Sequence, residues 1–257
     1  MECDAPEIDR KDLIDGLGKG LRVIECFDFE HPRLTTTEVS TRTGLSRAAA
    51  RRHLLTLCHF GYADTDGRYF WLAPRVLRLG RSFLDSARLP RLVQPFIQRI
   101  SMQCGETVNY SVLDGHEIVY VARSNPPKLV SIGYHVGARV PAHLVAPGAA
   151  ILSTLNDAEL DGWLAAHEFV AFVADATCDR TQFLAEVQAA RSLHYQISHQ
   201  QLDVGLAGIA VPLRDRKGTC TGAIGMTVQQ PAYSESQMIE KLLPLLRSAA
   251  QDLRTIL

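Results

Sequence analysis

LTTTEVSTRTGLSRAAARRHLLTLCHFGYA, residues 34–63, is the stretch that decides the fold at the start of this chain. Thr36 and Thr37 predict the cap of a short helix, on which Val39 faces inward. Gly44 predicts a tight turn after that helix, because glycine adopts a positive φ without strain. Ser46 predicts the N-cap of a longer helix that runs to about residue 60. The stretch therefore indicates two helices joined by a glycine turn.

A β-hairpin is expected directly after the second helix. Residues 62–64 and 69–72 are short runs of strand-forming residues, and Asp66-Gly67 between them is a strong hairpin signal. A short helix, a tight turn, a second helix and a hairpin are together typical of a winged helix-turn-helix. The second helix of that motif enters the major groove of DNA.

The charges of this region favour DNA binding. No Asp or Glu occurs between Val39 and Ala63, whereas four arginines do. Arginine pairs well with guanine edges and with phosphates, although a solvated helix face would carry the same residues. The residues expected to contact DNA are Thr36, Thr37, Ser46, Arg47, Ala48, Arg51, Arg52 and, at the hairpin tip, Arg68.

The composition of the whole chain is that of an ordinary globular protein. The chain is 46% hydrophobic and 21% charged, and its length of 257 residues favours two domains over one. The formal net charge of −1 does not by itself indicate a nucleic-acid binder, so the local basic stretches carry that argument. The domains expected are a winged helix-turn-helix in residues 1–73, a linker helix in residues 74–90 and an effector-binding domain in residues 91–257.

The cysteines and histidines predict neither a metal site nor a catalytic centre. The six cysteines are scattered, without a CxxC pair or a Cys/His cluster at zinc spacing. The polar, acidic first residues and the lack of an apolar run near the ~20 residues of a membrane span indicate a cytoplasmic protein with reduced thiols. We expect no cofactor, no metal, no catalytic residues and no membrane association.

Helices and hairpins alternate in the rest of the chain. A linker helix is expected from Pro74 to Leu89, with an interruption at Pro90 and a further helix to Gln103. The expected strands are residues 107–113, 117–122, 129–134, 208–213 and 221–228. The later expected helices are residues 149–155, one capped by Thr181, and one that begins with a Ser234/Gln237 capping box and ends at Leu257. Mixed strands and helices with short hairpins predict an α+β domain around an antiparallel sheet.

Several segments resemble the IclR family of bacterial regulators. Beyond residues 34–63, the resemblance lies in YFWLAPRVLRLGRSFL (69–84), GETVNYSVLDGHEIVYVAR (105–123), VGARVPAH (136–143) and GLAGIAVPLRD (205–215). PRVLRLG (74–80), LPRLVQPFIQRIS (89–101) and SRAAARR (46–52) resemble its branch of aromatic-catabolism regulators, typified by PcaR, PcaU and PobR. The resemblance covers nearly the whole chain from about Gly16.

This resemblance implies a winged helix-turn-helix, a linker helix used in dimerisation and a GAF-like effector domain. It further implies a dimer or tetramer that binds a pseudo-palindromic operator as a repressor or an activator. It places the effector between the sheet and the loop that precedes Pro147-Gly148, and effectors of the branch are β-ketoadipate, protocatechuate and 4-hydroxybenzoate. The implied effector-binding residues are Tyr110, Ser111, Arg139, His143, Val145, Ala146, Pro147, Ser198, Gln200, Gly208, Ile209 and Ile224.

Arg139, His143 and His135 are the cations expected near a carboxylate effector. A structural salt bridge at Arg139, a satisfied polar role for His143 and an ordinary sheet position for Tyr110 are the alternatives. Where the branch reads PAYCTSMGR, this chain reads PAHLVAPGA (141–149), so the polar Cys-Thr-Ser set is replaced by apolar residues. The expected effector is therefore an aromatic or cyclic carboxylic acid, larger or less polar than protocatechuate.

The competing hypothesis is a small-molecule sensor or enzyme of the GAF-like type with a non-catalytic N-terminal domain. Cys104 or Cys220 could serve such an enzyme as a nucleophile. No recognisable nucleophile elbow, carboxylate pair or metal-binding triplet accompanies them. The sequence therefore favours a ligand-responsive DNA-binding transcriptional regulator, and not an enzyme.

Overall fold

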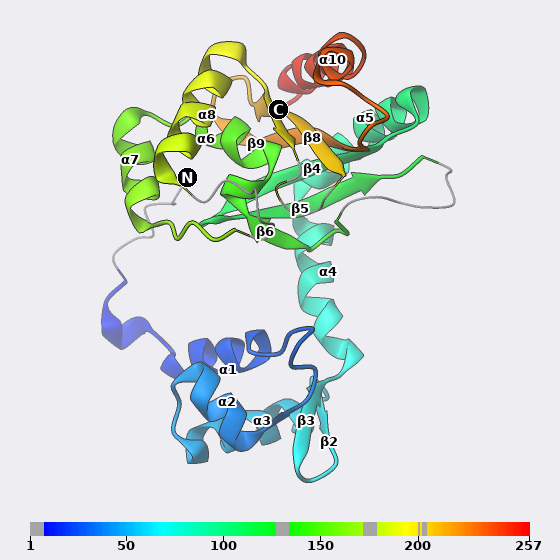
Figure 1. Ribbon diagram of the computed structural model, residues 1–257. Helices are drawn as coiled ribbons and strands as arrows, with labels where there is room; N and C mark the ends of the chain where they lie inside the picture. Colours follow the sequence, from blue (N-terminus) through cyan, green and yellow to red (C-terminus); the bar gives the residue numbers. More distant parts are fainter. Residues whose placement is uncertain (1–7, 127–133, 172–178, 200, 202–204) are drawn as a thin grey trace. The chain divides into compact units, whose positions relative to one another are not determined.

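The computed structural model describes residues 8–126, 134–171, 179–199, 201 and 205–257 (Figure 1). Contacts between residues divide the chain after Ser86 into two units, which are described separately below. Among the described residues, no helix has both the length and the apolar character that a membrane span requires.

The N-terminal unit is a small helical domain with a three-stranded sheet. Its strands are antiparallel in the order β1-β3-β2, and the β2–β3 hairpin pairs Thr65 with Phe70. Its core gathers residues from α1, α2, α3 and the sheet, including Val23, Val39, Leu54 and Phe70. The elements are η1 (Arg10–Asp12), α1 (Asp15–Glu25), β1 (Leu34–Thr35), α2 (Thr36–Thr43), α3 (Arg47–His59), β2 (Ala63–Thr65), β3 (Tyr69–Leu72), η2 (Pro74–Val76) and α4 (Leu77–Ser86).

Local signals explain how α2 and α3 begin and end. Gly44 ends α2 in the left-handed conformation, at φ 70°, and Ser46 caps α3 by accepting a hydrogen bond from the Ala49 amide, as predicted. The cap of α2 is corrected by one residue: Thr35 forms a capping box with Glu38, so Thr36 is already helical. The two helices and the hairpin confirm the winged helix-turn-helix.

The second unit is an α+β domain around one six-stranded antiparallel sheet, as predicted. The strand order is β6-β5-β4-β9-β8-β7, so β4 pairs with β9 more than 100 residues later in the chain. The helical elements are α5 (Arg88–Cys104), η3 (Ala142–Leu144), α6 (Ala146–Leu152), α7 (Asp157–Ala166), α8 (Arg180–Leu193), α9 (Glu235–Gln237), the π-helical turn η4 (Met238–Leu242) and α10 (Leu243–Arg254). The strands are β4 (Thr107–Asp114), β5 (Glu117–Ser124), β6 (Arg139–Pro141), β7 (Gln196–His199), β8 (Leu206–Arg214) and β9 (Cys220–Gln229).

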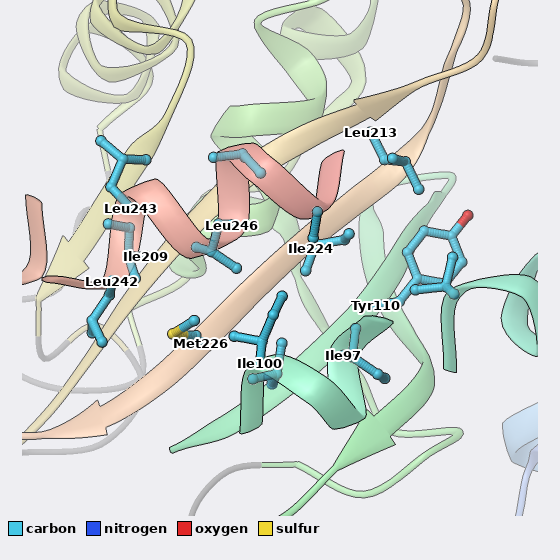
Figure 2. Close-up of a cluster of buried hydrophobic side chains, with 14 of the residues drawn as sticks. Ile97, Ile100, Tyr110, Ile209, Leu213, Ile224, Met226, Leu242, Leu243 and Leu246 are labelled. Carbon is cyan, nitrogen blue, oxygen red and sulfur yellow. The ribbon is translucent and has the colours of Figure 1, made fainter. Parts of the chain in front are cut away.

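Helices cover both faces of this sheet. Helices α5 and α10 pack on one face, where alternate residues of β4, β8 and β9 supply the largest core cluster (Figures 1 and 2). Helix α6 lies on the opposite face and contacts β8 and β9, with α8 packed behind it. Because successive strand residues point to opposite faces, each strand position belongs to one of these two layers.

Several predicted helix boundaries were wrong. The expected helix from Pro74 to Leu89 is instead η2 and α4, and the chain breaks at Ala87, whose ψ is 120°. Pro90 lies in the first turn of α5, where a missing amide proton costs no helical hydrogen bond. Helix α6 begins at Ala146, so Pro147 also lies in a first helical turn, where its missing amide proton costs no helical hydrogen bond.

Two further caps were compared with the sequence. Asp179, not Thr181, caps α8, because its carboxylate accepts a hydrogen bond from the Thr181 amide. The Ser234/Gln237 capping box is confirmed, but the last helix ends at Arg254. The strand expected at residues 129–134 falls, except for its last residue, outside the described residues.

Candidate nucleic-acid interface and effector pocket

Helix α3 presents one continuous basic face to the surroundings of its domain. Ala50 and Leu54 are buried in the core, which turns Arg47, Arg51 and Arg52 outward. Arg47 and Arg51 are four residues apart and therefore neighbours on the helix, and Arg52 follows them on the exposed side, away from Ala50 and Leu54. Within the described part of the chain none of the three has an ion-pair or hydrogen-bond partner for its guanidinium.

The rest of the predicted DNA-contacting set borders this face. Thr37, Ser46 and Ala48 are exposed and Thr36 is half-buried; the two threonines begin α2, and Ser46 and Ala48 lie at the start of α3. By contrast, Arg42 at the end of α2 is paired with Asp28 and His31, so its charge is already engaged. The free positive charge of the motif is therefore concentrated on α3.

The wing is held by the side chain of Asp66. Its carboxylate accepts hydrogen bonds from the amides of Arg68, at 3.0 Å, and Tyr69, at 2.8 Å. These bonds hold the pKa of Asp66 below its usual value. Arg68 is exposed at the tip, with its guanidinium 5.1 Å from the centre of the Tyr69 ring. The tip thus offers one ordered cation.

A pocket lies in the second unit between the sheet and the loop that leads into α6. Its cavity volume is about 50 Å³, and the figure rises to about 510 Å³ when the open space at its mouth is included. The walls are mostly apolar, which is typical of sites for small organic ligands. The lining residues are Asn109, Tyr120, Tyr134, Leu144, Val145, Ala146, Pro147, Ser198, Gln201, Leu206, Ala207, Gly208, Gly225, Met226 and Thr227.

Two close approaches give the pocket wall its shape. A Cβ on Gly148 would lie 1.8 Å from the carbonyl oxygen of Ala142, so only glycine allows α6 to pack against η3. A Cβ on Gly208 would lie 3.0 Å from the hydroxyl oxygen of Ser198, and that hydroxyl accepts a hydrogen bond from the Ala146 amide at 3.1 Å. The loop before α6 is thereby tied to strand β7 across the pocket.

Five of the residues implied by the family resemblance line this pocket. They are Val145, Ala146, Pro147, Ser198 and Gly208. Gln200 lies outside the described residues.

Tyr110, Ile209 and Ile224 do not line the pocket. All three are fully buried in the cluster beneath α5 and α10, on the opposite face of the sheet (Figure 2). The Tyr110 hydroxyl donates a hydrogen bond to the Thr221 carbonyl oxygen at 2.6 Å. Strand alternation turns these three side chains away from the pocket. Tyr110 is thus the ordinary sheet residue of the alternative interpretation.

Ser111 and Arg139 also lie outside the pocket lining. Ser111 is buried on β4, and alternation from Asn109 puts it on the pocket side of the sheet. Arg139 pairs at the surface with Asp114, at 2.8 Å, and with Glu117, at 2.7 Å. Arg139 therefore occupies a structural ion pair, and His135 is exposed.

His143 is not the cation that a carboxylate effector would need. It is buried, and burial lowers the pKa of its imidazole below the ordinary value. One ring nitrogen, Nε2, lies 3.1 Å from the Val170 carbonyl oxygen, and Nδ1 lies 2.7 Å from Nε2 of His167. His143 is thus neutral and packed behind the pocket wall.

The polar side chains of the pocket were missed by the sequence reasoning. Asn109, Tyr120 and Thr227 come from strands, and Tyr134 comes from the segment that precedes β6. A sufficient signal for Asn109 existed in TVNYSVL (107–113), where apolar Val108, Tyr110 and Val112 alternate with polar Asn109 and Ser111. Among the described residues, no group of three His, Cys, Asp or Glu side chains is arranged to hold a metal ion.

Comparisons with known proteins agree with this geometry. The family "IclR helix-turn-helix domain" matches residues 16–67, and "Bacterial transcriptional regulator IclR C-terminal" matches residues 81–255. The chain is 38% identical over 255 residues to the p-hydroxybenzoate hydroxylase transcriptional activator of Acinetobacter baylyi, covering 97% of this chain and 94% of that one. It is 35% identical over 243 residues to the Pca regulon regulatory protein of Pseudomonas putida, covering 94% and 84%.

The solved structure of an inducer-binding domain is similar to this chain. The inducer-binding domain of an Acinetobacter PobR double mutant, in complex with 3-hydroxybenzoic acid, matches with a TM-score of 0.63 and 32% identity. The match covers 66% of this chain and all of that one. Both matching families describe transcriptional regulators, which confirms the expectation that the chain is not an enzyme.

Proposed function

Because the chain belongs to the IclR family of bacterial transcriptional regulators, we propose that it binds an operator through α3 and senses an aromatic carboxylic acid in its second unit. The observation that carries the first half is the set of exposed, unpartnered arginines on α3. Basic side chains that face solvent without an ion-pair partner are free to meet phosphates and base edges. The proposed DNA contacts are the eight residues predicted from the sequence: Thr36, Thr37, Ser46, Arg47, Ala48, Arg51, Arg52 and Arg68.

The effector class is drawn from the pocket and from the relatives. The name of one relative refers to p-hydroxybenzoate hydroxylase, and another is solved with 3-hydroxybenzoic acid. The mostly apolar walls of the pocket in this chain suit the faces of a substituted benzene ring. A hydroxybenzoate-like acid, acting at an operon of aromatic catabolism, is the effector that fits both observations.

A dimer is proposed as the operator-binding form. Helix α4 exposes Leu77, Leu79 and Phe83 to 75%, 45% and 51%, and contains no buried residue. A second copy of the chain would cover these side chains, and two-fold symmetry would match a pseudo-palindromic operator. Residues 74–90 then serve as the linker between a DNA-binding domain in 1–73 and an effector domain in 91–257. Such a regulator acts in the cytoplasm, where its operator lies.

The DNA-binding face is tested by removing its charges. We expect Arg47→Ala and Arg51→Ala each to weaken binding to the chain's own upstream DNA by roughly 10- to 100-fold, as for arginines that contact bases. Fluorescence anisotropy with labelled DNA, at several salt concentrations, measures both affinity and its salt dependence. A phosphate contact would show as a shallower salt dependence in the variant.

Arg22→Ala is the matched control for this experiment. Arg22 is exposed on α1 of the same domain, and its removal changes the net charge by the same amount. We expect it to leave affinity within about twofold, as for surface changes outside an interface. Equal affinities of the Arg47, Arg51 and Arg22 variants would contradict the assignment of α3 as the DNA-reading helix.

A further inference from the structure

Asn109 is an unusual side chain in the wall of the pocket. It is 3% exposed, and its buried Oδ1 has no hydrogen-bond partner among the residues that the structure describes. A buried polar atom without a partner costs free energy, and such atoms in native proteins often mark a ligand site. Gly225 lies directly across from Asn109 on β9, so no side chain from that position occupies the adjoining space.

Two uncharged hydroxyl groups, those of Ser111 and Tyr120, belong to the same face of the sheet as Asn109. Tyr120 lines the pocket, and Ser111 is its direct neighbour across the β4–β5 pair. The Ser111 hydroxyl is buried without a partner, and no hydrogen bond of the Tyr120 hydroxyl is found in the part of the chain that the structure describes. Asn109, Ser111 and Tyr120 therefore form a neutral polar patch that lacks internal hydrogen bonds.

This patch suits a hydroxyl better than a carboxylate. A carboxylate only accepts hydrogen bonds, so it would leave the Asn109 Oδ1 unsatisfied, whereas a phenolic hydroxyl can donate to that atom. Burial raises the pKa of Tyr120, so its phenol stays protonated and uncharged. The described lining of the pocket contains no charged side chain. Arg123, across the β4–β5 pair from Asn109, already donates hydrogen bonds to Asn125 Oδ1 and to the Tyr134 carbonyl oxygen. A buried carboxylate without a cation of its own is costly.

We propose that Asn109 is the specificity-determining residue of the pocket and that it accepts a hydrogen bond from the phenolic hydroxyl of the effector. Tyr120 adds a second neutral group at the same end. The effector class is thus a hydroxylated aromatic, bound with its hydroxyl against β4 and its charged end directed away from it. This inference rests on the proposed aromatic effector and adds which group of that effector is read.

Calorimetric titration of the full-length protein with three ligands tests the inference. The ligands are 4-hydroxybenzoate, 4-methoxybenzoate and benzoate, with the 3-substituted isomers measured alongside. We expect the better-binding hydroxybenzoate to bind roughly 10- to 100-fold more tightly than its methoxy and unsubstituted counterparts, because these leave the Asn109 acceptor unsatisfied. This comparison uses the wild-type protein, so it does not depend on the folding of a variant.

Asn109→Leu should then abolish the preference, bringing the three dissociation constants within about threefold of one another. Ser198→Ala is the matched control, because it also removes a polar group from the pocket wall but leaves β4 intact. It should alter all three affinities by a similar factor. Thermal unfolding of both variants verifies that they fold.

The outcomes separate the inference from the proposed function. Tight binding of all three ligands by the wild-type protein, or an unchanged preference in a folded Asn109→Leu variant, would overturn the role of Asn109 alone. Failure of every aromatic acid to bind would overturn the proposed effector class, and the inference would fall with it.

Discussion

His143 and His167 show how burial decides what a single residue does. Nε2 of His143 must carry a proton to meet the Val170 carbonyl oxygen, so Nδ1 accepts a hydrogen bond from Nε2 of His167. The Nδ1 of His167 is then an unprotonated nitrogen, buried without a partner. Burial, followed by repulsion from His143 and His116, lowers the pKa of His167 to about 4.

This histidine pair predicts acid sensitivity. An unfolded histidine has a pKa of about 6.5, so as pH falls from 6.5 towards 4 the unfolded chain binds a proton at His167 that the folded chain does not. The free energy of unfolding therefore falls across this range. At pH 5 the proton uptake at His167 lowers the free energy of unfolding by about 1 kcal/mol, after allowance for the partial exposure of this side chain.

His167→Gln removes this proton uptake. Urea unfolding at pH 7 and pH 5 should show a smaller loss of stability in the variant than in the wild type. His135→Gln, an exposed site in the same domain, should lose as much stability as the wild type. Equal pH dependence in all three proteins would mean that His167 is protonated in the folded state.

Individual residues were predicted well where a local rule governs them. Ser46, Gly44 and Asp66-Gly67 act through neighbours within a few positions, so their sequence signals were sufficient. For Tyr110 and His143 the sequence left two interpretations open, because their roles depend on which face of a sheet or which wall of a core surrounds them. Those surroundings come from distant segments.

At the scale of elements, α4 contains no buried residue, although it carries the large apolar side chains of Leu79 and Phe83. Arg78, Arg81 and Asp85 gather on one side, whereas Leu79 and Phe83 lie side by side on another. An apolar stripe left exposed on a helix indicates a partner surface. The predicted end of this helix was also wrong, because Pro90 predicts a helix interruption but lies in the first turn of α5.

Leu79→Glu tests the role of this stripe. A buried charge without a partner at a dimer contact is strongly unfavourable, so we expect the dimer dissociation constant to rise at least tenfold and operator affinity to fall with it. Light scattering after size exclusion measures the first quantity and anisotropy measures the second.

Ser82→Glu is the control, since it adds the same charge next to the polar side of α4. It should leave both the oligomeric state and operator affinity close to wild type. A Leu79→Glu protein that dimerises normally would remove α4 from the dimer contact.

At the scale of the whole molecule, the sequence predicted the fold class and the family, and both are confirmed. The order of the six-stranded sheet was not predictable, because β4 and β9 are joined by pairing and not by any local pattern. The same limit hid the pocket, whose walls come from β4, β5, β7, β8, β9 and the loop before α6. Periodicity describes each strand but not its neighbours.

Regulation requires that the two units influence one another's ligands. An effector shifts operator affinity only by its differential affinity for the DNA-bound and free states. By linkage, operator DNA must change effector affinity by the same factor, which is commonly about 5- to 150-fold. The effect of the effector on operator affinity and the effect of operator DNA on effector affinity can be measured independently, and both test the same prediction.

The most direct measurement is the affinity of the full-length protein for its own upstream DNA, with and without saturating hydroxybenzoates. We predict specific binding, at least about a thousandfold tighter than to bulk DNA, that one hydroxybenzoate changes by fivefold or more. Binding no tighter than to bulk DNA, or specific binding that no aromatic acid alters, would contradict the account of this protein as an aromatic-responsive regulator.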